Sequence, residues 1–283
     1  MTRRWTAPLL ASLALFSGCQ VDLRPEELAE LSAPRDEAGG RRLLAQAEAA
    51  QVGSAAPWKS VTGVRVELRD AYYGLTGSVA RPWPEDPAEV VLHFRPGSDD
   101  SLAEFQDGEQ TLRWGIHDWN TWTQEGAGPR EYSDEPDADV AFWLPTLEYF
   151  LEMAFRLGEA QFVDLAAPRR VRGELCDVVY LTWGSYGPND EVDQYVAYVS
   201  RETRRLVRVD FTVRDFADFI QGRVLYSDFR QVGGYWLPHL LEIGEDPPED
   251  QLHTITVRAW QVGVPLSDEA LKPDPRRRPA QKP

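Results

Sequence analysis

The stretch GRVLYSDFRQVGGYWLPHLLEI, residues 222–243, decides how the rest of this sequence is interpreted. Two runs rich in apolar and aromatic residues, 222–230 and 236–243, flank the pair Gly233-Gly234. Two such runs joined by a glycine pair are typical of a β-hairpin, because glycine tolerates the positive φ angles of a tight turn. This stretch therefore predicts two neighbouring antiparallel strands.

A period of two recurs along most of the chain. Val64, Val66 and Leu68 alternate with charged residues, which gives one apolar face and one polar face. Other expected strands cover residues 90–95, 112–116 after the Asp107-Gly108 turn signal, 178–183, 194–200, 206–214 and 252–262. The polar segment 200–204 is a further expected hairpin connection. Nine strands with short links predict one large antiparallel sheet.

One central segment has the helical period instead. From Thr146 to Leu157, apolar residues recur every three or four positions, with Glu148 and Glu152 on another face. Pro145 stands where such a helix could begin. A helix with this much apolar surface must pack against another apolar surface, and the concave face of the sheet is the expected partner. The prediction is an α+β fold, in which a large curved antiparallel sheet, an incomplete β-barrel, has a helix or helices covering its concave face.

The first eighteen residues are interpreted as a lipoprotein signal peptide. Arg3 and Arg4 precede an apolar stretch, residues 7–16, that is too short to remain as a membrane-spanning helix. Leu15-Phe16-Ser17-Gly18-Cys19 resembles the bacterial lipobox, which implies cleavage between Gly18 and Cys19 and lipidation of Cys19. The alternative is an ordinary signal peptide in which this cysteine is incidental.

The remaining chain is expected to hold one domain between two flexible ends. Residues 19–40 contain several Pro and Gly residues and predict a tether with one short helix near 26–31. A single domain is expected over residues 41–264, beginning with an Ala-rich helix at 41–51. The Pro- and Arg-rich residues 265–283 are expected to be a disordered tail.

Charge and cysteine content narrow the possible partners. The formal net charge is −16, and it becomes −18 once residues 1–18 are removed. Such a surface repels nucleic acid and anionic headgroups, so membrane attachment is expected through acyl chains on Cys19. Gln20, by resemblance to the sorting rule of bacterial lipoproteins, favours the outer membrane, facing the periplasm. An acylated Cys19 leaves Cys176 without a partner, and its apolar neighbours predict a buried thiol.

The order of these elements resembles the LolA/LolB-type superfamily of lipoprotein carriers and receptors. The resemblance rests on the Ala-rich helix with Trp58, the strand at 61–70, the segment 193–199, and the hairpin 226–239, which is similar to the family pattern Y-x-D-Y-R-x-V-D-G-x-W-L-P. In that hairpin Gly233 replaces the usual Asp and Phe229 the usual Tyr. The resemblance implies an incomplete barrel, closed by helices, that encloses a hydrophobic cavity for acyl chains.

No motif in the sequence predicts catalysis, so neither enzymatic activity nor a cofactor is expected. His117-Asp118 could act as a base, but a polar pair at the end of a strand is commoner. Asn189, Asp190, Glu191 and Asp193 offer oxygen ligands for Ca²⁺ without the spacing of a known loop, and a solvated hairpin tip is the commoner structure. No metal is expected.

Aromatic residues are the remaining candidates for a site. Trp114, Trp143, Phe150 and Phe155 are proposed to line a hydrophobic cavity, although a large aromatic core would use the same residues. The leading hypothesis is a membrane-anchored envelope lipoprotein that binds a lipid, an acyl chain or a lipoprotein in a half-barrel. The alternative is a protein-interaction or sensor module with a filled core, no ligand and an envelope protein as partner.

Overall fold

The computed structural model describes residues 20–30, 35–132, 135–214, 217–247 and 250–271 of the 283-residue chain. Its strands are β1 (Val64–Tyr72), β2 (Ala88–Phe94), β3 (Ser101–Asp107), β4 (Gln110–His117), β5 (Asn120–Glu125), β6 (Glu131–Tyr132), β7 (Phe162–Val171), β8 (Glu174–Thr182), β9 (Gln194–Ser200), β10 (Leu206–Thr212), β11 (Gln221–Val232), β12 (Tyr235–Asp246) and β13 (Asp250–Val262). The helices are α1 (Glu26–Ala29), α2 (Glu37–Val52), α3 (Gly74–Ala80), α4 (Ala138–Arg156) and α5 (Asp268–Leu271), with short 3₁₀ turns η2 (Trp58–Ser60) and η3 (Leu157–Glu159).

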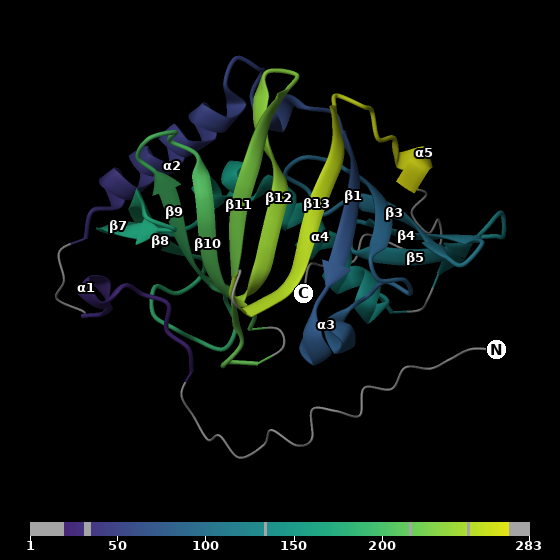
Figure 1. Cartoon of the computed structure of the whole chain (residues 1–283), viewed down its shortest axis with the longest axis horizontal. Helices are drawn as coiled ribbons and strands as arrows, with labels where there is room; N and C mark the ends of the chain where they lie inside the picture. Colours follow the sequence, from purple (N-terminus) through teal and green to yellow (C-terminus); the bar gives the residue numbers. More distant parts are fainter. Residues whose placement is uncertain (1–19, 31–34, 133–134, 215–216, 248–249, 272–283) are drawn as a thin grey trace.

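All thirteen strands form one antiparallel sheet in the order β6-β5-β4-β3-β2-β1-β13-β12-β11-β10-β9-β8-β7. The sheet is therefore two meanders, β1–β6 and β7–β13, joined where β1 pairs with β13. It curves without closing, so β6 and β7 remain its two edges (Figure 1). The predicted α+β fold, an incomplete barrel of antiparallel strands, is confirmed.

Helix α4 lies inside this curve. Its side chains meet rings from strands far apart in the sheet: Phe150 lies 5.3 Å from Phe211 of β10, and Trp143 lies 6.3 Å from Tyr72 of β1, centroid to centroid. The helix begins at Ala138, eight residues before the expected start, because Asp137 caps it by accepting hydrogen bonds from two backbone N–H groups of the first turn. Pro145, expected at the start, is inside the helix.

Helix α2 also packs on the concave side, against β7 and α4. It begins at Glu37 rather than at residue 41, and it contains Gly40, which suggested a flexible segment in the sequence. A Cβ atom at Gly40 would lie 2.8 Å from Val163 and 3.1 Å from the backbone nitrogen of Leu165. The glycine therefore allows close contact between helix and strand instead of flexibility.

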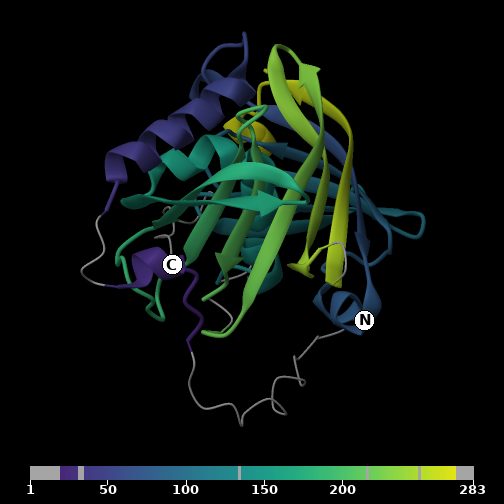
Figure 2. The same ribbon diagram turned by 60° about the vertical axis from the view of Figure 1, so that its left-hand side comes forward.

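A second, smaller core covers the outer face of β7–β9. Residues 20–30, expected as part of a tether, pack on this face with Leu28 buried. Figure 2 shows the short helix α1 of this segment on the left-hand side of the molecule. Strand β8 is therefore buried on both faces, which explains its unbroken apolar run from Val178 to Leu181. Cys176 is fully buried there and free, as predicted, and burial raises the pKa of its thiol to about 11.

Both predicted hairpin links are confirmed. Gly233 and Gly234, with φ angles of 59° and 95°, connect β11 to β12, and residues 201–205 connect β9 to β10. In the part of the chain expected to be a disordered tail, α5 packs on the domain with Leu271 buried. Within the described residues, no helix has both the length and the hydropathy needed to cross a bilayer.

Candidate functional site

The four residues proposed to line a cavity all belong to the large core between α4 and the sheet or pack against it. Phe155 stacks on Trp58 with centroids 4.4 Å apart, and Trp114 of β4 packs edge-on against Phe105 at 5.0 Å. Trp143 is half-buried near β1. These three contribute to the aromatic core. Phe150 is one of the residues that line a small cavity.

That cavity measures about 10 Å³ and lies between α4 and the β11–β12 side of the sheet. Phe150, Leu151, Met153 and Tyr226 are among the residues around it. A volume of this size is at the lower limit for one water molecule. In the described conformation, the concave face of the sheet is filled by α4 rather than open to a ligand.

The same helix carries a feature that the sequence pattern misassigned. Glu148 and Glu152, expected on a separate polar face, are both fully buried. They lie one helical turn apart on the side of α4 that faces the β2–β3 connection, residues 95–100. The prediction was wrong because the half-barrel encloses the helix on nearly all sides, so even its polar stripe meets protein.

Glu152 is well compensated. One of its oxygens accepts the indole N–H of Trp58 at 2.8 Å, and the other accepts Arg156 at 3.0 Å. The backbone N–H of Gly97 donates to both oxygens at 3.1 Å. Burial raises the pKa of Glu152, and the bonds from Trp58 and Arg156 oppose that rise. This carboxyl group ties the helix to η2 and to the β2–β3 connection.

The cost of burying the carboxyl group of Glu148 is not offset by hydrogen bonds. Neither carboxyl oxygen has a hydrogen-bond partner among the described residues. Complete burial, and then the nearby charge of Glu152, raise the pKa of Glu148 well above its usual range. A buried polar group without a partner costs about 1–3 kcal/mol. Helix α4 is therefore held in the half-barrel with an energetic penalty on one of its own side chains.

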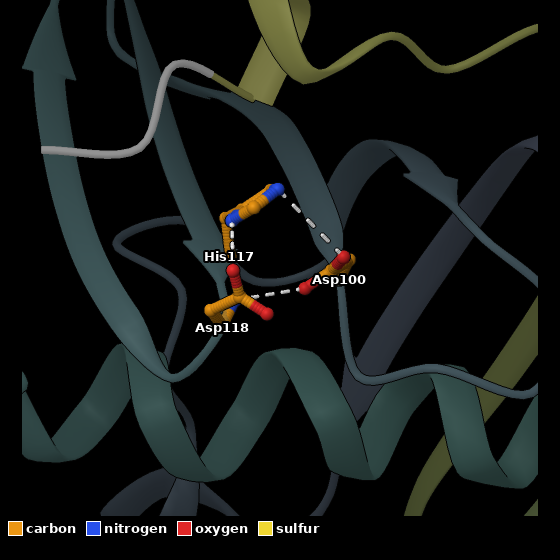
Figure 3. Close-up of side chains that lie close together, drawn as sticks. All are labelled: Asp100, His117 and Asp118. Carbon is orange, nitrogen blue, oxygen red and sulfur yellow. Dashed lines mark hydrogen bonds and ion pairs between the residues drawn. The ribbon is translucent and has the colours of Figure 1, made fainter. Parts of the chain in front are cut away.

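A polar cluster formed by Asp100, His117 and Asp118 lies beside α4 (Figure 3). His117 ends β4, its Nδ1 is 3.2 Å from an Asp118 oxygen, and its Nε2 is 4.0 Å from an Asp100 oxygen. Asp100 also accepts the backbone N–H of Asp118 at 2.9 Å and Arg95 at 3.2 Å. The hydrogen bonds close the tight β4–β5 turn, in which Asp118 and Trp119 have positive φ angles.

These three residues are the group in the described chain whose atoms could together hold a metal ion. The guanidinium of Arg95 already donates a hydrogen bond to the Asp100 carboxylate, so a metal cation would have to compete with it. His117-Asp118 is thus the strand-end polar pair that the sequence suggested. In the oxygen-rich segment 189–193, Asn189 accepts the backbone N–H groups of Glu191 and Val192, while Asp193 accepts the backbone N–H of Arg214 and the hydroxyl of Thr212. The oxygens there stabilise a hairpin tip.

Comparisons with known proteins find solved structures of similar fold. No family model matches the chain, and no curated protein does. A DUF1329 family protein from Desulfovibrio piger is similar in structure, with 13% identity, a TM-score of 0.52, and coverage of 84% of this chain and 98% of that one. A putative outer membrane lipoprotein-sorting protein domain from Vibrio parahaemolyticus has 11% identity, a TM-score of 0.49, and coverage of 83% and 97%. A LolA superfamily protein from Nitrosomonas europaea has 12% identity, a TM-score of 0.49, and coverage of 82% and 96%.

The fold and the site define a class of structure, an open antiparallel half-barrel wrapped around a central helix. The fold that the sequence resemblance implied, an incomplete antiparallel barrel with helices on its concave side, is confirmed, and the DUF1329 family protein has a similar fold. At 13% identity the likeness concerns the fold alone.

Proposed function

We propose that this chain is a bacterial envelope lipoprotein, cleaved between Gly18 and Cys19 and held by acyl chains on Cys19 at the outer membrane, facing the periplasm. The lipobox-like residues 15–19 support the anchor, and Gln20 supports the outer membrane. Cys19 lies outside the described residues. Two or more acyl chains give stable attachment, whereas one chain alone is only marginal.

The anchor is tested by Cys19→Ala in the full-length chain. The variant should leave the membrane fraction, because all acyl chains are lost together and the described helices offer no spanning segment. Recovery of the variant in pellets that withstand a high-salt wash would refute the anchor. A Cys176→Ala chain is the matched control and should stay in the membrane.

The half-barrel is proposed to bind a hydrophobic ligand, such as a lipid, an acyl chain or a lipoprotein, in the place that α4 now fills. The observation that carries this proposal is Glu148, which is fully buried without a partner on the helix that fills the concave face. A ligand that displaced α4 would return this carboxyl group to water and remove the penalty. The apolar ligand would then cover the concave surface that α4 leaves.

The test uses an apolar fluorescent dye and the full-length Cys19→Ala chain. Saturable dye binding, reversed by a fatty acid, is expected. Glu148→Leu should weaken it by about 5–150-fold, because a closed state favoured by 1–3 kcal/mol shifts the apparent affinity by that factor. Native mass spectrometry of the same chain would detect a lipid that remains bound during purification.

A second candidate is favoured by the volume of the interior. A cavity of about 10 Å³ fits an interaction or sensor module with a filled core, which would bind an envelope protein through its surface or a sheet edge. Absence of dye binding in both chains would refute displacement of α4 and leave this second function.

A further inference from the structure

The large apolar side chains that remain exposed are gathered at one end of the molecule. Within the described residues, the exposed ones are Tyr73, Leu75, Val79 and Phe219, with exposed fractions of 44%, 83%, 66% and 51%. The first three belong to α3 and the residue before it, directly after β1. Phe219 belongs to the connection between β10 and β11.

Strand pairing places these two segments at the same end of the sheet. Tyr72 at the end of β1 pairs with His253 at the start of β13, and Thr212 at the end of β10 pairs with Gln221 at the start of β11. Three strands separate β1 from β10, so the two segments lie roughly 20 Å apart at the usual strand spacing. Figure 1 shows α3 and the start of β11 at the lower end of the molecule.

Helix α3 lacks the charged residues of an ordinary surface helix. The sequence from Ala71 to Ala80 contains no charged residue, and only Gly77 within the helix is buried. Gly77 lets the helix pack closely on β13, since a Cβ atom there would lie 2.8 Å from the carbonyl oxygen of Leu252. The helix is therefore held firmly against the sheet while it presents Leu75 and Val79 outward.

The beginning of the described chain is fixed to this same end. The N–H of Val21 donates to the carbonyl oxygen of Asp218 at 3.0 Å, and the carbonyl oxygen of Val21 accepts Arg214. The N–H of Leu23 donates to Gln194 at the start of β9, at 2.8 Å. Two residues of extended chain span about 7 Å, so Cys19 is within that distance of Val21.

We infer that the end formed by residues 73–80, 213–214 and 217–220 docks on the lipid surface to which the chain is anchored. The inference rests on the proposed acylation of Cys19, which would hold this end, and no other, within a few ångströms of the headgroups. Leu75, Val79 and Phe219 then enter the interface, in the manner of short apolar segments at membrane surfaces. The half-barrel stands on the membrane in one orientation instead of moving on a flexible tether.

The charges of this end favour apolar insertion over electrostatic attraction. Asp218, Glu245 and Asp250 are exposed there. Such carboxylates would be repelled by anionic headgroups. Docking should therefore be at least as strong on phosphatidylcholine as on mixtures with phosphatidylglycerol, and added salt should not weaken it.

The test measures how close each end lies to the bilayer. The mature acylated chain is placed in phosphatidylcholine vesicles that contain a lipid with a nitroxide on its headgroup. A bimane fluorophore is attached to Thr76→Cys in α3 or, as a control, to Gln231→Cys near the opposite end of β11. Both positions are exposed, and Cys176 is buried, so labelling is confined to the introduced cysteine. Ten residues of strand separate Gln231 from the start of β11, or about 33 Å.

The nitroxide should quench the fluorophore at Thr76→Cys several-fold more than the one at Gln231→Cys. Adding Leu75→Ser and Val79→Ser should reduce this quenching towards the control value while the acyl chains keep the protein on the vesicles. Equal quenching at the two ends, or no response to the serine substitutions, would refute the docking surface. A mass spectrum recorded beforehand separates the two proposals, because a chain without acyl groups would refute the anchor itself and the docking that rests on it.

Discussion

The two buried glutamates of α4 can each be replaced by leucine, and the effects of the two substitutions on stability can be compared. Glu148 and Glu152 are one helical turn apart and fully buried, and they differ in their partners. Replacing either one by Leu keeps a similar volume and a good helix former. The comparison therefore isolates the hydrogen bonds and the charge of each carboxyl group.

Opposite signs are expected for the two variants. Glu148→Leu removes a buried group that has no partner and should stabilise the protein by about 1–3 kcal/mol. Glu152→Leu leaves Arg156, the Trp58 N–H and the Gly97 N–H without their acceptor, and breaking such a buried pair costs about 3–5 kcal/mol. The two free energies of unfolding should thus differ by several kcal/mol.

Urea denaturation followed by tryptophan fluorescence measures both free energies. Midpoint and slope should be fitted separately, because a change in slope would report a change in the exposed surface instead of stability. Loss of stability in Glu148→Leu comparable to that in Glu152→Leu would mean that Glu148 has a favourable partner, and the argument for displacement of α4 would fail.

The pH dependence gives an independent check. The pKa of Glu148 is raised on folding, so the folded state binds more protons than the unfolded state between the two pKa values. Its contribution to stability is fully present below the unfolded value, about 4.3, and is lost as the pH rises through the folded value. The stability advantage of Glu148→Leu over the wild type should therefore grow with pH in this interval. An advantage that shrinks as the pH rises would contradict the sign.

Three further predictions concern packing and reactivity. Phe155→Ala should cost about 3–5 kcal/mol, because the ring is stacked on Trp58 in a filled core, and a loss below 2 kcal/mol in urea denaturation would indicate free space. Gly40→Ala should destabilise by about 1–3 kcal/mol despite the better helix propensity of alanine, since its Cβ would overlap β7. Gly158→Ala, with open space around it, is the matched control and should be nearly neutral. The Cys176 thiol should resist a thiol reagent at pH 8 in the folded protein and react once denatured, because burial raises its pKa to about 11; rapid reaction in the folded protein would contradict that burial.

The alternation of apolar and polar residues predicted the sheet. Strands were missed where small or polar side chains, or a proline, hide that alternation. In β3, Ser101, Ala103 and Phe105 point inward, so small and polar side chains hide the alternation. In β7, Pro168 interrupts the pattern at a register shift, which an edge strand tolerates. Both strands exist because neighbours pair with them.

The site could be predicted only in part, because burial of a polar residue is decided by distant segments. Glu148 and Glu152 are spaced for a polar face, and only the enclosure of α4 by the sheet places them in the core. Of the four aromatic candidates, Phe150 and Phe155 are buried, and Trp114 and Trp143 are half-buried. Whether these side chains line a cavity or fill the core depends on how closely α4 packs on the sheet. The spacing of apolar residues in the sequence does not reveal that distance.

The strand order also sets the sequence of events by which the chain can fold. Within each meander, neighbours in the sheet are neighbours in the chain, and such local contacts form quickly. The pairing of β1 with β13 is different, because it joins residues 64–72 to residues 253–262 and includes the buried contact of Asp70 with His253 at 2.8 Å. A chain that emerges from its N-terminus must keep the edge of β1 unpaired until the last strand arrives. The protein is therefore most exposed to wrong edge-to-edge pairing late in folding, when the first meander has formed and β13 has not yet paired with it.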